Sequence, residues 1–145
     1  MFTNVTFHCP REFVPVSDED GILSVRGAEW FVALLGQIPE IEVKSELCQE
    51  DWGVVVFAKC GRSRFWIGLS AFPEGDANWI AHVHHGPGTL MQRFLPSGKQ
   101  ALRNLASALH LVLKKNRSIS AIRWFTEAEM RSGKNRRGSN DPNRA

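Results

Sequence analysis

The chain has 145 residues, of which 43% are hydrophobic and 23% charged, and this composition suits one water-soluble domain with a sizeable core. The net charge of +3 arises at the C-terminal end: residues 131–145 hold five Lys/Arg and one Asp, whereas residues 1–130 hold 13 basic and 14 acidic residues. A near-neutral body gives no charge argument for nucleic acid. Residues 1–51 hold ten acidic and three basic residues, which fits an acidic face for a cationic partner, or simply oppositely charged elements lying side by side.

Neither the N-terminus nor any apolar run indicates a membrane segment. The first ten residues lack the basic start and the apolar core of a signal peptide. The longest apolar runs, WFVALLG and GVVVFA, are far shorter than the roughly 20 residues that span a bilayer. We therefore expect a cytoplasmic protein with no membrane partner. Cys9, Cys48 and Cys60 form no CxxC pair, so we expect free thiols.

Hydrophobic periodicity predicts two helices and six strands. Apolar residues at helical spacing predict the helices, at 24–35 and 97–116. Alternating or continuously β-branched runs predict the strands, at 2–9, 40–47, 52–60, 63–72, 79–85 and 118–125.

This order of elements indicates an α+β fold in a single domain that spans residues 1–130. We expect an antiparallel sheet of four to six strands, built as a meander, with two helices packed on one face. Residues 131–145 contain no large apolar side chain, so we expect them to form a disordered basic tail.

Three histidines lie close together in WIAHVHHGPG, residues 79–88. On a strand, His82 and His84 point to the same side and lie about 7 Å apart. Two imidazoles so placed bind zinc or iron when a third ligand arrives from a neighbouring strand, for which His8 or a cysteine is a candidate. The motif contains no carboxylate. We favour the alternative, two structural or solvated histidines, and expect no cofactor.

The turn CQEDWG, residues 48–53, places two carboxylates beside a tryptophan. General acid–base catalysis needs separated and differently tuned groups, which adjacent acids in a turn do not provide. Such acids are commonly solvated. If they have a function, we expect recognition of a protein, with Trp52 as the anchor and Glu50 and Asp51 as the partners of an Arg or Lys.

A second tryptophan, Trp66, is opposite in phase to the apolar residues of its strand, whereas Arg62 and Arg64 share its phase. Such tryptophans are most often simply core or half-buried residues. If this face has a function, Trp52, Trp66 and the histidines either stack nucleic-acid bases or form a protein interface. We favour the protein interface and include Trp66 in it. Nucleic acid stays an alternative, to which the basic tail would add phosphate contacts, although such tails commonly serve solubility.

The sequence lacks the motifs of common enzyme classes. It contains no GxSxG, no HExxH, no paired CxxC and no glycine-rich dinucleotide turn, and PSGKQ lacks the glycine spacing of a phosphate loop. We therefore expect a binding protein and not an enzyme.

Three segments resemble immunity proteins, which are encoded beside polymorphic or contact-dependent bacterial toxins: CQEDWGVVVFAKCGRSRFWIGLS, LASALHLVLKK and AIRWFTEAEM, together about a third of the chain. The resemblance implies a non-enzymatic inhibitor that occludes the active site of a cognate toxin, often with acidic and aromatic side chains. In this sequence that role falls to Glu50, Asp51 and Trp52, supported by Glu74 and Asp76 of a later loop. The near-neutral body differs from the strong acidity of nuclease inhibitors, which argues against a nuclease as the toxin.

Overall fold

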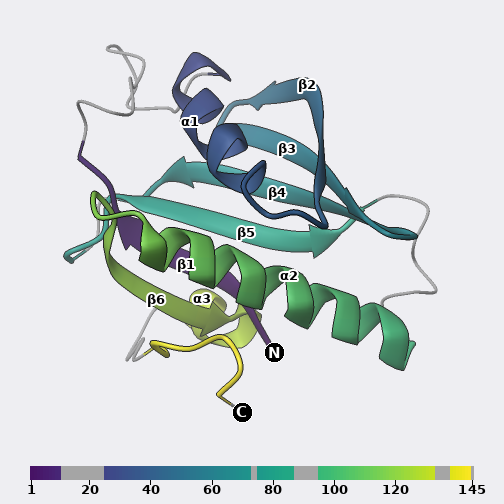
Figure 1. Cartoon of the computed structure of the whole chain (residues 1–145). Coiled ribbons are helices and arrows are strands. Elements are labelled where there is room, and N and C mark those ends of the chain that lie inside the picture. Colours follow the sequence, from purple (N-terminus) through teal and green to yellow (C-terminus); the bar gives the residue numbers. More distant parts are fainter. Residues whose placement is uncertain (11–24, 73–74, 87–94, 133–137, 145) are drawn as a thin grey trace.

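The computed structural model describes residues 1–10, 25–72, 75–86, 95–132 and 138–144. The strands in this part of the chain are β1 (Phe2–His8), β2 (Glu42–Glu50), β3 (Gly53–Cys60), β4 (Ser63–Ala71), β5 (Trp79–His85) and β6 (Ser120–Thr126). The helices are α1 (Val25–Leu35), α2 (Pro96–Lys115) and α3 (Glu127–Ser132) (Figure 1). None of these helices is long and apolar enough to cross a membrane.

The six strands form one antiparallel sheet in the order β2-β3-β4-β5-β1-β6. The strands from β2 to β5 are the predicted meander, and each pairs with the next along the chain. The N-terminal strand β1 then lies between β5 and β6, so that Asn4 pairs with His82 on one side and with Phe125 on the other. The antiparallel α+β fold predicted from the sequence is confirmed.

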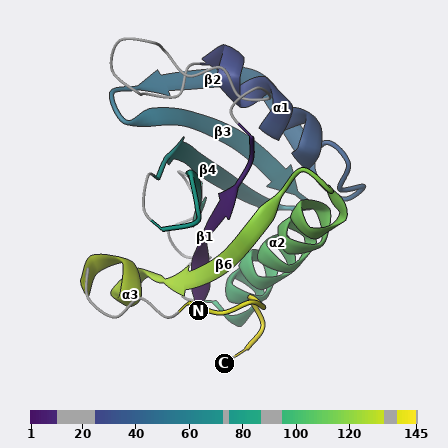
Figure 2. The same cartoon turned by 90° about the vertical axis from the view of Figure 1, so that its left-hand side faces the viewer.

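Helices α1 and α2 cover one face of the sheet, as Figure 2 shows. Side chains alternate between the faces of a strand, so Val54 and Val56 of β3 and Ile67 of β4 enter the core, where all three are fully buried. Phe31 of α1 and Leu109 of α2 are fully buried in the same core. This is the predicted arrangement of two helices on one side of the sheet.

The short helix α3, which the sequence analysis did not predict, follows β6 directly. It begins with a capping box, in which the backbone N–H of Thr126 donates to the Glu129 carboxylate (2.8 Å) and the backbone N–H of Glu129 donates to the Thr126 hydroxyl (3.2 Å). These reciprocal bonds satisfy two backbone donors at the start of the helix. The chain therefore passes from β6 into α3 without an intervening loop.

The prediction of a disordered tail from residue 131 is wrong for the described part of that segment. Arg131 and Ser132 complete α3, and Ser139 pairs with Trp124 through two backbone hydrogen bonds of 2.7 Å. Pro142 is buried, and the Ser107 hydroxyl of α2 donates to Asn143 (3.0 Å). The physical reason is that the edge strand β6 offers unpaired backbone groups, which the tail satisfies without apolar side chains. Residues 133–137 and 145 lie outside the described residues.

Candidate functional site

The sheet face opposite α1 and α2 is named the distal face. It consists of the strand residues that alternate with those of the core: Asn4, Thr6, Val55, Phe57, Lys59, Arg64, Trp66, Gly68, Ser70, Ile80, His82, His84, Arg123 and Phe125. Helix α3 lies over one end of this face, because Glu127, Met130 and Arg131 line a hollow together with Asn4, His82 and His84. At the other end lie the β2–β3 turn and the loop between β4 and β5.

Trp52 lies on the distal face over a glycine. A Cβ atom placed on Gly68 would lie 2.8 Å from Cη2 of Trp52 and 3.1 Å from Cζ3 of Trp66, so only glycine leaves room for both indoles. Trp52 is nevertheless 41% exposed. The structure thus brings together two of the predicted partner-binding residues, and it holds one of them as a fixed, half-exposed aromatic side chain.

Trp66 is itself held by a histidine of the next strand. Its indole stacks on the imidazole of His84, with ring centroids 4.4 Å apart and planes inclined by 17°. The two residues are paired neighbours on β4 and β5. One of the two histidines that we considered as metal ligands therefore supports the tryptophan cluster.

The other histidine, His82, is mostly buried and bonded to β1. Its Nδ1 lies 2.6 Å from Oδ1 of Asn4, and the Asn4 amide donates in turn to the carbonyl oxygen of Phe125 (3.4 Å). Because the Asn4 oxygen can only accept, Nδ1 of His82 carries the proton. Burial, and secondarily the nearby His84, lowers the pKa of His82 to about 4, so the ring is neutral at pH 7. His82 thus links β5, β1 and β6.

Within the described ranges, no group of three or more His, Cys, Asp or Glu side chains is placed to hold a metal ion. The third ligand that a zinc or iron site on His82 and His84 would need is therefore not found among these residues.

The acidic residues Glu50 and Asp51 are exposed at the β2–β3 turn. The turn is fixed by Gln49, whose side-chain amide donates to the carbonyl oxygens of Glu50 (3.0 Å) and Gly53 (2.9 Å). In the part of the chain that the structure describes, neither acid forms an ion pair. The Glu50 carboxylate accepts a hydrogen bond from the Cys48 thiol (3.5 Å), which raises the pKa of that exposed thiol.

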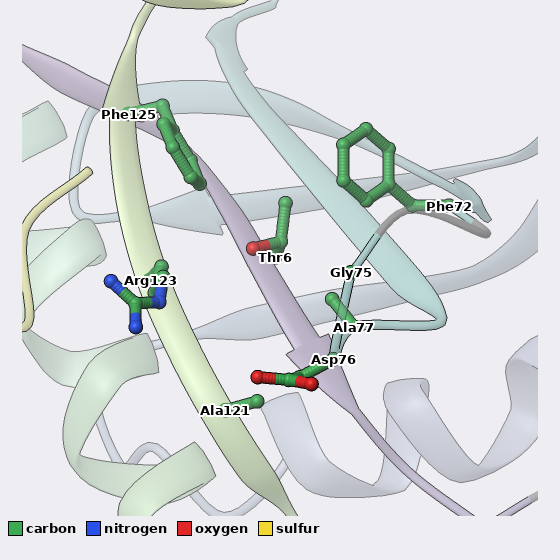
Figure 3. A pocket seen from close by; sticks show the side chains of 8 residues that line it. All are labelled: Thr6, Phe72, Gly75, Asp76, Ala77, Ala121, Arg123 and Phe125. Carbon is green, nitrogen blue, oxygen red and sulfur yellow. The ribbon is translucent and has the colours of Figure 1, made fainter. Parts of the chain in front are cut away.

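A pocket of about 270 Å³ opens at the same end of the sheet, between the β4–β5 loop and β6. Figure 3 shows Thr6 at its floor, Phe72 and Phe125 on either side, and Asp76 near Ala121. The loop is anchored by Asn78, whose side chain accepts from the Cys9 N–H (2.8 Å) and donates to the Cys9 carbonyl (2.6 Å).

The antiparallel register decides which predicted residues meet. Gly53, the first residue of β3, lies next to the last residues of β2 and β4, so these strand termini share one end of the sheet. The loop that follows β4 therefore places Asp76 at the same end as Glu50 and Asp51. Glu74 lies outside the described residues. Arg62 lies in the β3–β4 turn at the opposite end, away from this cluster.

Sequence reasoning missed the residues that β1 and β6 supply to the pocket, namely Thr6, Arg123 and Phe125. The alternation in β6 assigns Arg123 and Phe125 to one face, but it does not reveal that β1 lies next to them.

Comparisons with known proteins give no relative. No protein-family model, no curated protein and no solved structure matches the chain.

Proposed function

We propose that the chain is a stoichiometric protein-binding inhibitor of the immunity-protein type, which acts in the cytoplasm and occludes a cognate toxin. The observation that carries the proposal is the half-exposed indole of Trp52, fixed over Gly68 beside an acidic turn. Its partner is proposed to dock on the distal face, at the end where Glu50, Asp51 and Asp76 lie.

Trp52 has the properties of an interface hot spot. Hot spots are enriched in tryptophan, and a side chain that is already fixed loses little conformational entropy when a partner covers it. A tryptophan buries up to about 250 Å², so 41% exposure leaves about 100 Å² to cover, which corresponds to about 2.5 kcal/mol of binding free energy.

The acids around Trp52 favour a basic partner. Glu50 and Asp51 are exposed and form no ion pair with described residues, so their charges are available to steer and pair with Arg or Lys. Reversing both charges is expected to weaken binding by roughly 2–5 kcal/mol, because charged groups of the partner would be left buried and unpaired.

The distal face gives less support to nucleic acid as the partner. Single-strand binding surfaces combine aromatic side chains with a continuous basic groove. Here Lys59 pairs with Glu42 (3.9 Å), Arg131 pairs with Glu127, and the turn next to Trp52 is acidic. The charges on this side are therefore mixed.

The test begins with a tagged chain purified from its native host and examined by native mass spectrometry. We expect a one-to-one complex with a second protein. We also expect Trp52→Ala and the double variant Glu50→Lys/Asp51→Lys to lose that protein. The matched control is Leu111→Ala, because Leu111 is a large apolar residue that is 56% exposed on α2 and so lies away from the distal face.

The inhibitor role is tested by expressing the captured partner alone. We expect this to arrest growth, and we expect co-expression of the wild-type chain, but not of Trp52→Ala, to restore it. A partner that leaves growth unaffected would refute the inhibitor function. Equal capture by wild type and Trp52→Ala would refute the docking site.

A further inference from the structure

The pocket at the acidic end of the distal face is suited to a single side chain. Its volume of about 270 Å³ lies below the roughly 300–1,000 Å³ of sites that enclose drug-sized ligands. It opens on the same side of the sheet as Trp52. The Trp52 indole packs over Gly68 of β4, and the floor of the pocket lies on β1, two strand spacings away. The indole and the pocket are therefore about 10 Å apart. One protein interface of ordinary size covers both.

The walls of the pocket are aromatic. Phe72 and Phe125 stand on either side of Thr6 in Figure 3 and come from the β4–β5 loop and from β6. The Phe72 N–H donates to the Asn78 carbonyl oxygen (2.9 Å), which fixes the backbone at this wall. The Phe125 ring packs against Gly138, where an added Cβ would lie 2.8 Å from the ring. Two phenyl faces suit an alkyl stem, and they attract a cation placed over them.

The floor and the rim add polar groups. Thr6 is only 2% exposed and lines the pocket. A threonine hydroxyl both donates and accepts, so the floor offers a polar group to a side chain that enters from outside. At the rim, the exposed carboxylate of Asp76 has no ion-pair partner in the described ranges.

The backbone of β6 is strained where it borders this pocket. Ala121 has a φ of +52°, which is rare for a residue with a side chain, and the pairing of β1 with β6 shifts register between Thr6 and His8. Such strain and bulges are concentrated at functional sites, where they redirect side chains.

We propose that the pocket receives one arginine or lysine side chain of the partner protein, with its stem between Phe72 and Phe125 and its charged head at Asp76. This inference rests on the proposed function, because it takes the partner to be a protein. It adds to Trp52 a second anchor of opposite character: the chain inserts Trp52 into the partner, and the partner inserts a basic side chain into the chain.

The probe for this pocket is N-acetyl-arginine amide, titrated into isotope-labelled protein and followed by NMR. We expect the resonances of Thr6, Asp76 and Phe125 to shift with a Kd of about 1–10 mM, a range set by the small size of the probe. N-acetyl-glutamate amide at equal ionic strength should leave them unchanged. Asp76→Asn should weaken binding of the arginine probe by about fivefold, whereas the matched control Glu29→Gln, an exposed acid on α1, should not.

Two outcomes would overturn the proposal. If the glutamate probe shifts the same resonances more strongly, the pocket is an anion site at Arg123. If neither probe shifts them, it is no side-chain site. The titration contains no partner protein, so the two proposals fail separately. A negative titration refutes the pocket site but not the capture of a partner through Trp52, and a failed capture does not change the result of the titration.

Discussion

The mostly buried histidine His82 leads to a prediction about stability against pH. Its pKa is 6.5 in an unfolded chain and about 4 in the folded protein, where burial, and secondarily His84, disfavours the charged ring. As the pH falls below 6.5, the unfolded chain takes up a proton that the folded protein does not. The stabilisation is therefore fully present above pH 6.5, is lost between pH 6.5 and 4, and changes no further below pH 4.

The magnitude follows from the difference of about 2.5 pKa units. Each unit corresponds to 1.36 kcal/mol, so full protonation costs about 3 kcal/mol, of which about 2 kcal/mol is already lost at pH 5. His82→Gln removes the titrating ring and keeps an N–H donor that can reach Asn4. Between pH 7 and pH 5, the wild type is expected to lose about 2 kcal/mol more free energy of unfolding than this variant.

Urea unfolding of both proteins at pH 7 and pH 5 measures this difference, and equal m-values would show that the same surface is exposed in each case. The free energy of unfolding of His110→Gln is measured at the same two pH values for comparison. Burial also lowers the pKa of His110, which accepts a hydrogen bond from the Trp124 indole (3.2 Å). If wild type and His82→Gln lose the same free energy of unfolding, the buried, neutral state assigned to His82 is wrong.

Three further perturbations test the distal face and its supports. Gly68→Ala places a methyl group against Trp52, so we expect a loss of about 1–3 kcal/mol in stability and a shifted Trp52 indole N–H signal by NMR; an unchanged signal would show that the ring does not lie there. Asn78→Ala removes both bonds that anchor the β4–β5 loop and should cost about 1–3 kcal/mol in urea unfolding. Truncation before residue 138 leaves the backbone groups of Trp124 at the β6 edge unpaired, so we expect concentration-dependent association in analytical ultracentrifugation. A monomer at all concentrations would contradict the capping role of the tail.

Most of the fold could be predicted from the sequence because its elements are strongly patterned and its turns are short. The continuous apolar run of β3 and the helical spacing in α2 indicate their structures locally. The position of β1 could not be predicted in this way, because it depends on pairing between Asn4 and residues about 80 and 120 positions away.

The candidate site was predictable in its residues but not in its arrangement. Glu50, Asp51 and Trp52 stand out in a turn, yet the sequence does not indicate that the Trp52 indole lies back over Gly68 against Trp66. That contact depends on the absence of a side chain on the neighbouring strand. The order of the tail could not be predicted for a related reason. Ser139 is held by backbone hydrogen bonds to an edge strand, and such bonds do not appear in the hydrophobic pattern of the sequence.

The central claim, that Trp52 anchors a protein partner on the distal face, is tested most directly by calorimetric titration of the captured partner with wild-type and variant chains. Covering about 100 Å² of Trp52 corresponds to about 2.5 kcal/mol, so Trp52→Ala should raise the Kd on the order of 50-fold, while Leu111→Ala on α2 should leave it within about twofold. An equal Kd for wild type and Trp52→Ala, or a larger loss for Leu111→Ala, would place the partner elsewhere on the molecule.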